Sequence, residues 1–240
     1  MARASWLACI VLLLSLRASA TWSNVQTWKS TTCTTTSNTC SQTLTSAATA
    51  GNVIVVLVSM NLNDTVSTVT DSGSSTYVLP GSCAMLEPTA PLFNMCAYTL
   101  SVVGGTTTVT ATRGTSTTCT WFLRTAEFHS TATEAFDVAG ATIASTATTS
   151  PVGPALTLTG TNDLVVHSIR TSSPSAISGG YTFTSFTQGA AGYLLNTSTA
   201  PTPTWTTTSA KAAMVGIAFS ETGGVQQPVI NVITENRPPQ

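Results

Sequence analysis

Ionisable side chains are scarce in this 240-residue sequence, and the scarcity excludes several classes of function. Only 7% of the residues are charged, against about 25% in an average soluble domain. Eight basic and nine acidic residues give a formal net charge of −1, and no basic run occurs. The chain therefore lacks the positive surface that nucleic acids and anionic membranes attract. We expect no nucleic-acid partner.

Motifs for common metal and nucleophile chemistry are also missing. No C-x-x-C pair occurs, so the cysteine spacing fits no common zinc site. No G-x-S-x-G frame marks a hydrolase nucleophile, and the sequence contains only two histidines. Beyond the N-terminus no apolar run approaches the roughly 18 residues that suggest a membrane span. We therefore expect no cofactor and no membrane insertion, and favour a non-enzymatic protein over an enzyme.

The first twenty residues have the three parts of a secretory signal peptide. Arg3 supplies positive charge, residues 7–16 form an apolar core, and Ala18-Ser19-Ala20 matches a cleavage site. The expected organisation is a signal peptide over 1–20, one β-sandwich domain over 21–220, and a tail with Gly and Pro over 221–240. We expect the mature chain to be extracellular, either secreted or held in the periplasm or at the cell surface.

Five cysteines remain after cleavage, and pairing of nearest neighbours predicts two disulfides. These are Cys33–Cys40 and Cys83–Cys96. In an oxidising compartment each would stabilise the fold by about 2–4 kcal/mol through loop closure. Cys119 is left over and is expected to be a buried strand residue. Other connectivities remain open at this point.

Threonine and serine take the place of charged residues. The chain has 49 Thr and 28 Ser, close to a third of its length. Threonine loses side-chain freedom in helices and fits pleated strands well. A mean hydropathy of +0.27 argues against disorder, which combines low hydrophobicity with high net charge. The composition therefore indicates an all-β protein.

The arrangement of apolar segments predicts an antiparallel two-sheet β-sandwich, jelly-roll-like, with about twelve short strands. Residues 53–60 are apolar at nearly every position, so this strand should be central or covered on both faces. Residues 22–28 and the Thr-rich stretch up to Thr45 are expected to form an opening hairpin. A turn is expected near Ala139-Gly140, and a further strand at 155–159.

Several segments of the chain resemble a known module in their order. They include Gly51 to Val56, Val66 to Gly73 with Tyr77, Asn162 to Val166, and Ala212 to Phe219. This order resembles jelly-roll or lectin-like β-sandwich modules of secreted bacterial proteins. The resemblance covers roughly residues 45–220. It implies a fold but no settled activity, and therefore no catalytic residues.

The candidates for chemistry are Glu127, His129 and His167. Glu127 and His129 lie two apart on one expected strand, so their side chains share a face. With His167 they could bind a metal or act as acid and base. A structural role is favoured, with Glu127 paired to Arg124, Arg170 or backbone amides.

The candidates for sugar binding are aromatic. Trp205 and Tyr181 are the candidates, because an aromatic face stacks on the apolar surface of a sugar, although packing in the core is the favoured explanation for such residues. Weak candidates for calcium are the oxygen-bearing residues Asn61, Asn63, Asp64 and Asp71. Asn and Asp at such places more often form turns.

Three functions follow as hypotheses. The first is a secreted, non-enzymatic β-sandwich that binds carbohydrate or another cell-surface component. The second is a polysaccharide-acting hydrolase that uses Glu127 with Glu134 or Asp137 as the second carboxylate. The third is a surface-layer or filament subunit in which residues 229–233 donate a strand to a neighbour. The oligomeric state stays open.

Overall fold

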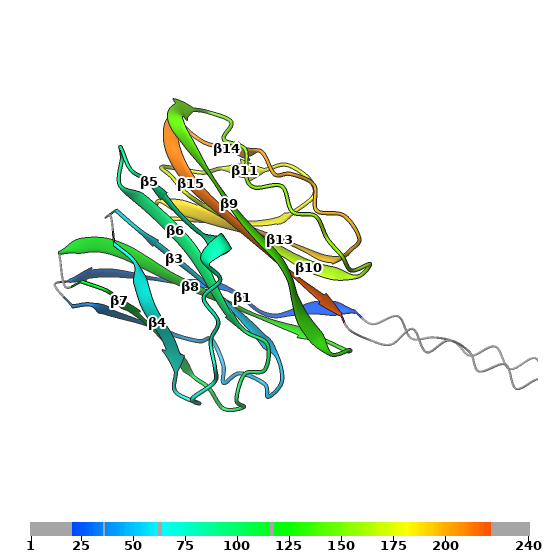
Figure 1. The fold of residues 1–240 in the computed structure, drawn as a ribbon. Coiled ribbons are helices and arrows are strands. Elements are labelled where there is room, and N and C mark those ends of the chain that lie inside the picture. The colour runs from blue at the N-terminus through cyan, green and yellow to red at the C-terminus, as the bar shows by residue number, and fades with distance from the viewer. Residues whose placement is uncertain (1–20, 36, 62–63, 116–117, 222–240) are drawn as a thin grey trace, which may run out of the picture.

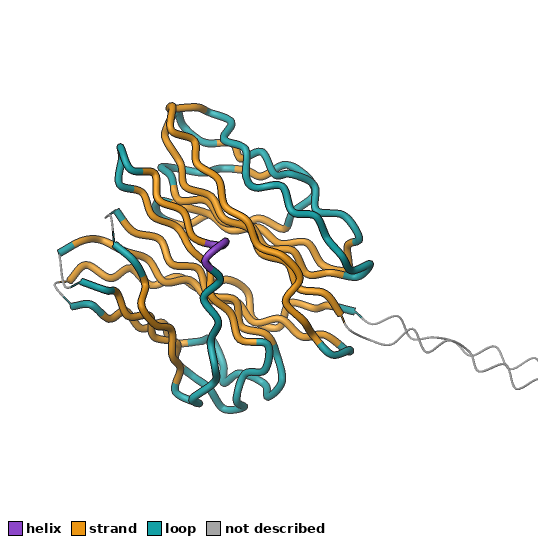
Figure 2. The backbone as a smooth tube through the Cα atoms, viewed as in Figure 1, coloured by secondary structure: helices purple, strands orange, loops and turns teal. Residues whose placement is uncertain are grey.

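The computed structural model describes residues 21–35, 37–61, 64–115 and 118–221, which are almost entirely β-structure (Figure 1). One 3-10 turn, η1 (Gly81–Cys83), is the helical element of this part of the chain (Figure 2). The expected signal peptide, Asn63 and the tail after Glu221 lie outside the described residues.

No helix within the described residues has the length and apolar character needed to cross a membrane.

A five-stranded antiparallel sheet lies in the middle of the molecule. Its strands, in spatial order, are β1 (Trp22–Thr35), β8 (Cys119–Ser130), β3 (Val53–Met60), β6 (Leu92–Thr99) and β5 (Ala84–Glu87). We call it the central sheet, because other sheets cover both of its faces.

Two further sheets pack on the central sheet, one on each face (Figure 1). The three-stranded sheet consists of β2 (Thr39–Thr43), β7 (Thr108–Arg113) and β4 (Val66–Asp71). The second five-stranded sheet consists of β12 (Thr182–Phe186), β13 (Gly189–Thr197), β10 (Asp163–Arg170), β15 (Ala210–Glu221) and β9 (Glu134–Thr148). A short pair, β11 (Ala176–Ile177) and β14 (Trp205–Thr206), belongs to the cover over the outer face of this second sheet.

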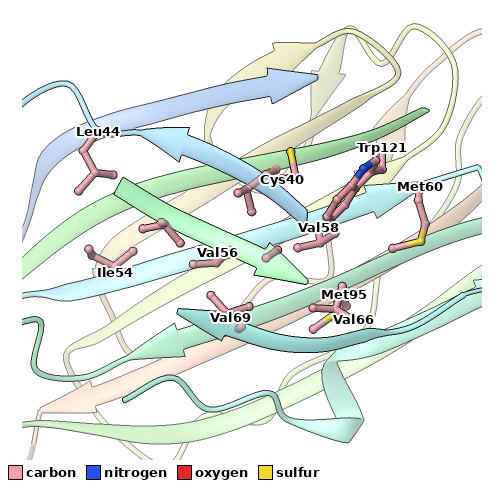
Figure 3. Close-up of a cluster of buried hydrophobic side chains, with 14 of the residues drawn as sticks. Cys40, Leu44, Ile54, Val56, Val58, Met60, Val66, Val69, Met95 and Trp121 are labelled. Carbon is pink, nitrogen blue, oxygen red and sulfur yellow. The ribbon is translucent and has the colours of Figure 1, made fainter. Parts of the chain in front are cut away.

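The layering explains why β3 is apolar along its length. Ile54, Val56 and Val58 point into the core beneath the three-stranded sheet (Figure 3). Val53 and Leu57 point into the core shared with the second five-stranded sheet. A strand buried on both faces needs apolar residues at odd and even positions alike. The prediction that residues 53–60 form a strand covered on both sides is confirmed.

The antiparallel all-β sandwich is confirmed, with more layers than expected. The described residues contain fifteen strands rather than about twelve, and a third sheet is stacked on the pair. The expected opening hairpin does not form. Instead, β1 pairs with β8 in the central sheet and β2 pairs with β7 in the three-stranded sheet.

Two details of the second five-stranded sheet also differ from expectation. No turn occurs at Ala139-Gly140, because β9 runs straight through these residues. A Cβ on Gly140 would lie 3.2 Å from Pro154 and Leu156, so this glycine allows close packing of the cover rather than a turn. Residues 155–159 form part of that cover and are not a strand.

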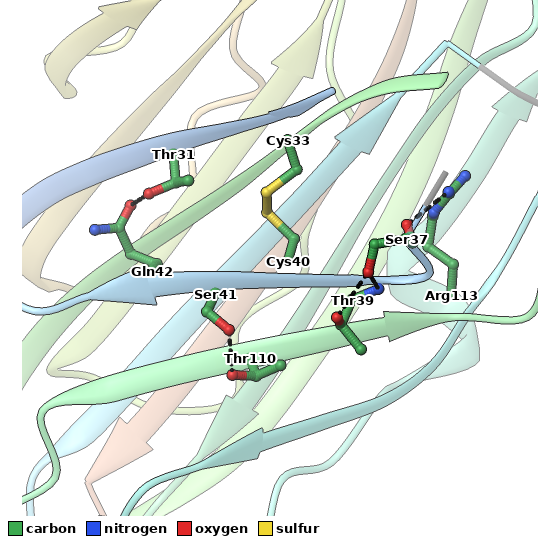
Figure 4. The surroundings of a disulfide bond; sticks show 9 residues. All are labelled: Thr31, Cys33, Ser37, Thr39, Cys40, Ser41, Gln42, Thr110 and Arg113. Atoms are coloured by element: carbon green, nitrogen blue, oxygen red, sulfur yellow. Dashed lines mark hydrogen bonds between the residues drawn. A yellow bond between two sulfur atoms is a disulfide. The ribbon is translucent and has the colours of Figure 1, made fainter. Parts of the chain in front are cut away.

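Both predicted disulfides are confirmed. Cys33–Cys40 joins β1 to β2 and so ties the central sheet to the three-stranded sheet (Figure 4), with Cα atoms 5.9 Å apart. Cys83–Cys96 joins η1 to β6 inside the core, with a Cα separation of 5.5 Å. Cys119 is a free, partly buried thiol on β8 whose sulfur accepts a hydrogen bond from Arg113 Nη1 at 2.9 Å. Burial raises the pKa of this thiol.

Candidate functional site

The carboxylate of Glu127 is buried and accepts hydrogen bonds on both oxygens. Oε1 accepts from the Thr49 backbone amide at 2.9 Å and from Asn52 Nδ2 at 2.5 Å, while Oε2 accepts from Gln26 Nε2. Only 1% of the residue is exposed. The donors are amides from the loop before β3 and from β1. Together they hold the carboxylate in place and keep water away from it.

His129 is connected to this carboxylate through Asn52. Since the Asn52 side chain donates to Glu127 with its nitrogen, its oxygen accepts from Nδ1 of His129, 3.0 Å away. In the neutral ring, Nε2 then serves as an acceptor. The His129 side chain is exposed. The expectation that Glu127 and His129 share a face of one strand therefore holds, with only His129 at the surface.

Arg124 and Arg170 are not the partners of Glu127. Arg124 lies three residues before Glu127 on β8, and an odd separation places two side chains on opposite faces of a strand. Glu127 points toward Gln26 and the loop at Thr49, whereas Arg124 points toward the second five-stranded sheet, where it contacts Phe186. Of the alternatives expected for Glu127, the two arginines are wrong and the backbone amide is confirmed, with Thr49 as the donor and the side-chain amides of Gln26 and Asn52 beside it.

His167 is far from the Glu127 network. It lies on β10 and faces the outer cover, where its ring meets Tyr181 edge-on at 5.3 Å. Burial lowers its pKa to about 3, so the imidazole is neutral at physiological pH. The residues opposite it on both neighbouring strands are glycines, Gly192 and Gly216. His167 therefore does not join Glu127 and His129 in one cleft.

The two aromatic candidates for sugar binding are core residues. Trp205 is 0% exposed and Tyr181 is 7% exposed. Trp205 packs against Ile169 and Met214, and the Tyr181 hydroxyl donates to the Pro201 carbonyl at 3.0 Å. Neither ring offers a free face at the surface, so both serve to hold the outer cover on the sheet.

The calcium candidates do not converge. Asp71 accepts from the Gly73 and Ser75 amides, which is a turn contact at one end of β4. Asp64, just before the other end of β4, lies 3.6 Å from Arg113. Asn61 accepts from Arg170, and Asn63 is not among the described residues.

Across the parts of the chain that the structure describes, no group of three His, Cys, Asp or Glu side chains is placed to hold a metal.

The carboxylates offered as partners for Glu127 have other contacts. Asp137 accepts from the backbone amide and hydroxyl of Thr159 at 2.9 and 2.5 Å. Glu134 lies near His129 at the surface, and burial raises its pKa. Neither can act across a sugar from Glu127, because the Glu127 carboxylate is enclosed by protein donors.

Asp163 gives the fold a pH dependence of its own. The residue is fully buried, and burial together with the neighbouring Asp137 raises its pKa from 3.8 to about 7. An acid whose pKa is higher in the folded protein binds protons more tightly there. The stabilisation is complete below about pH 4 and is lost as the pH rises through about 7.

We therefore expect the Asp163 contribution to stability to fall between about pH 4.5 and 7.5, while His167, whose pKa is lowered to about 3, contributes stability that rises up to about pH 6.5 and opposes this loss. In Asp163→Asn this part of the loss should vanish, because the amide does not titrate. Urea unfolding at a series of pH values measures the difference between the two slopes. Equal slopes would show that Asp163 does not titrate in this range in the folded protein.

Two adjoining hollows lie at the end of the molecule where β3 begins and β6 ends. One has a volume of about 570 Å³ and the other about 400 Å³. Both are lined by Leu100 and Ser101, so we call them together the Leu100 surface. The polar groups of the larger hollow are Ser101, His129, Ser130, Thr131, Thr133 and Glu134.

An aromatic pair lies next to the smaller hollow. Tyr98 lines this hollow and stacks on Phe136 of β9, with ring centroids 5.6 Å apart and planes inclined by 4°. Tyr98 is 5% exposed, but Phe136 is 37% exposed. Sequence analysis missed Phe136, because it interrupts an Ala- and Thr-rich stretch and carries no motif. Within the described residues, the structure identifies Phe136 as a large aromatic side chain that is exposed.

These side chains offer hydroxyl, imidazole and carboxylate groups on a rigid frame, with an aromatic face beside them. Such a set can hydrogen-bond to a ligand and stack on it.

No family model, no curated protein and no solved structure matches this chain.

Proposed function

We propose that the protein is an exported, non-enzymatic binding module whose Leu100 surface takes a carbohydrate. The two disulfides fit an oxidising compartment outside the cytoplasm. A surface poor in charge and rich in hydroxyl groups suits a ligand that is itself covered with hydroxyls. The hollows are open and lined by residues at and near the ends of paired strands, so binding needs little rearrangement.

The observation that carries the proposal is that the Glu127 carboxylate is buried and hydrogen-bonded on both oxygens. General acid or base catalysis needs a carboxyl group that can reach a substrate proton. Both oxygens of Glu127 are instead used by Gln26, Thr49 and Asn52 within the core. What this carboxylate does is fix Asn52, which in turn orients His129 at the surface.

In the proposed complex the polar and apolar parts of a sugar meet different residues. His129 Nε2 accepts from one sugar hydroxyl, and Ser101 and Glu134 take others. The exposed ring of Phe136 stacks on the C–H face of a neighbouring sugar unit. The two hollows together extend over more than one monosaccharide, so an oligosaccharide should bind more tightly than a single sugar.

A glycan array with two matched variants tests the proposal. Phe136→Ala should weaken binding roughly fivefold, since an aromatic contact contributes about 1 kcal/mol beyond its area. Ile143→Ala is the control, because Ile143 lies on the same strand and is 41% exposed. It should bind like the wild type. No binding by the wild type, or equal loss in both variants, would contradict the proposed site.

A further inference from the structure

Basic side chains gather at the end of the molecule opposite the Leu100 surface. Only five basic residues fall within the described residues, and three of them lie together there. These three are Arg124, Arg170 and Lys211, while Lys29 and Arg113 lie elsewhere. In a chain with 7% charged residues, such a concentration of one sign is unusual.

Arg124 is fully buried between the central sheet and the second five-stranded sheet. Its Nη1 donates to the Ser59 hydroxyl at 2.6 Å, and Nη2 donates to the Thr187 carbonyl at 3.4 Å. The guanidinium lies 5.2 Å from the ring of Phe122 and 4.8 Å from that of Phe186. These hydrogen bonds and ring contacts are with neutral groups.

Arg170 approaches the Phe122 ring from the second five-stranded sheet. Its guanidinium lies 5.4 Å from the Phe122 ring centroid. It donates to the backbone carbonyl and the side-chain oxygen of Gln188 at 2.5 Å each, to the Thr171 carbonyl at 3.3 Å, and also to the side chain of Asn61. Gln188 adopts a φ of +60° to present both oxygens. That conformation is uncommon for residues other than glycine.

The two guanidinium groups lack a carboxylate partner within the described part of the chain. The ion pairs found there join Arg113 to Asp64 and Lys211 to Glu87. A buried cation without a counter-ion is unfavourable, and two beside one another are more so. Burial and the facing Arg170 lower the pKa of Arg124 to about 9, and burial lowers that of Arg170 to about 10, so both arginines remain charged at neutral pH.

This cationic group borders an open hollow of about 510 Å³. Arg170 and Lys211 line the hollow, together with Asn61, Ser172 and Gln188. The Lys211 side chain is 31% exposed and lies 3.8 Å from Glu87. The wall of the hollow therefore carries a guanidinium, an ammonium and a hydroxyl group. Among the described residues, Glu87 is the one carboxylate that pairs with any of the three cations.

We infer that this hollow is a binding site for an oxyanion, either a carboxylate or a sulfate or phosphate group. Lys211 would contact the anion directly, with Ser172 donating from its hydroxyl group. The Arg170 guanidinium donates through both Nη groups to Thr171, Gln188 and Asn61, so it supplies positive charge at the wall of the hollow while its own hydrogen bonds stay within the protein. Arg124, behind Arg170, adds positive potential without touching the ligand.

The anion can come from two sources that share this chemistry. It can be a free ion, or it can be the charged group of an acidic polysaccharide. The hollow is larger than a single sulfate ion, so there is room for the atoms that would carry the group. The site is separate from the Leu100 surface, and its existence does not depend on carbohydrate binding there.

Titration of the protein with sodium sulfate, phosphate or acetate tests the inference. The titrations are done at a constant ionic strength of about 0.15 M, with chloride as the reference anion. NMR signals of the arginine Nε–H groups report the site. The Arg170 signal should shift in a saturable way, while that of Arg113 should stay unchanged. A second arm uses dextran sulfate and neutral dextran, which separates a polysaccharide source from a free ion.

Three variants decide the outcome. Lys211→Ala should weaken binding roughly tenfold, as loss of a charge-assisted contact does. Arg170→Lys keeps the positive charge at the wall and should weaken binding less than Lys211→Ala does. Lys29→Ala removes an exposed lysine elsewhere and should have no effect. The inference fails if no oxyanion shifts the Arg170 signal beyond chloride, or if Lys29→Ala weakens binding as much as Lys211→Ala.

Discussion

Glu127→Ala should lower the free energy of unfolding by about 3–5 kcal/mol, among the largest losses for a single substitution in this chain. The change removes an acceptor shared by Gln26, Thr49 and Asn52. Those three donors would be left in a region from which water is excluded. The loss should also free the loop before β3, because the Thr49 amide and the Asn52 side chain are both held by this carboxylate.

Two further variants show whether the loss comes from the network. Glu127→Gln keeps one acceptor oxygen but turns an NH₂ group toward a donor, so it should cost about 2 kcal/mol. Glu134→Ala removes a surface carboxylate of the same type and should change stability by less than about 0.5 kcal/mol. Urea unfolding measures all three. A loss below about 1 kcal/mol in Glu127→Ala would show that the network is not structural.

Gly216→Ala should cost about 2–3 kcal/mol, although alanine is ordinarily the better strand residue. A Cβ on Gly216 would lie 2.5 Å from Cε1 and 2.6 Å from Nδ1 of His167. The imidazole cannot move aside, because Tyr181 meets it from the cover and the residue is 1% exposed. The added methyl group must therefore push apart β10 and β15, or lift the cover.

A double-mutant cycle shows whether His167 is the cause. His167→Ala empties the space above Gly216, so the second change should then cost about 1–2 kcal/mol less than it does alone. Gly81→Ala is the matched control, since a Cβ there meets no atom within 4 Å. If the cost of Gly216→Ala is the same with and without the imidazole, the close packing of ring on glycine is not what limits this position.

The local pattern of apolar residues predicted the fold class, because in β3 and its neighbours this pattern matches the burial in the structure. The apolar run at 53–60 required cover on both faces, and the cysteine spacing gave the two disulfides. The assignment of strands to sheets did not follow, because pairing in a β-protein joins distant residues. Nothing near β1 shows that its partner is β8, about a hundred residues further on.

The candidate site was predicted less well, for a related reason. Residues such as Trp205 and His167 stand out by type, but the cover over the second sheet buries both. The residues that shape the Leu100 surface are ordinary ones, and they meet only because several strands end at the same place. Phe136 and Arg170 likewise stand out only because of neighbours on other strands. Tyr98 stacks on Phe136, and Arg124 lies beside Arg170.

Release of reducing ends from the glycan that binds best is the most direct test of a binding module against an enzyme. The protein is incubated with this glycan at the concentration that saturates the array signal, and new reducing ends are counted over time. We expect binding with no release above the buffer blank. Steady release by the wild type, lost in a folded Glu127→Gln variant, would contradict the structural role of this carboxylate.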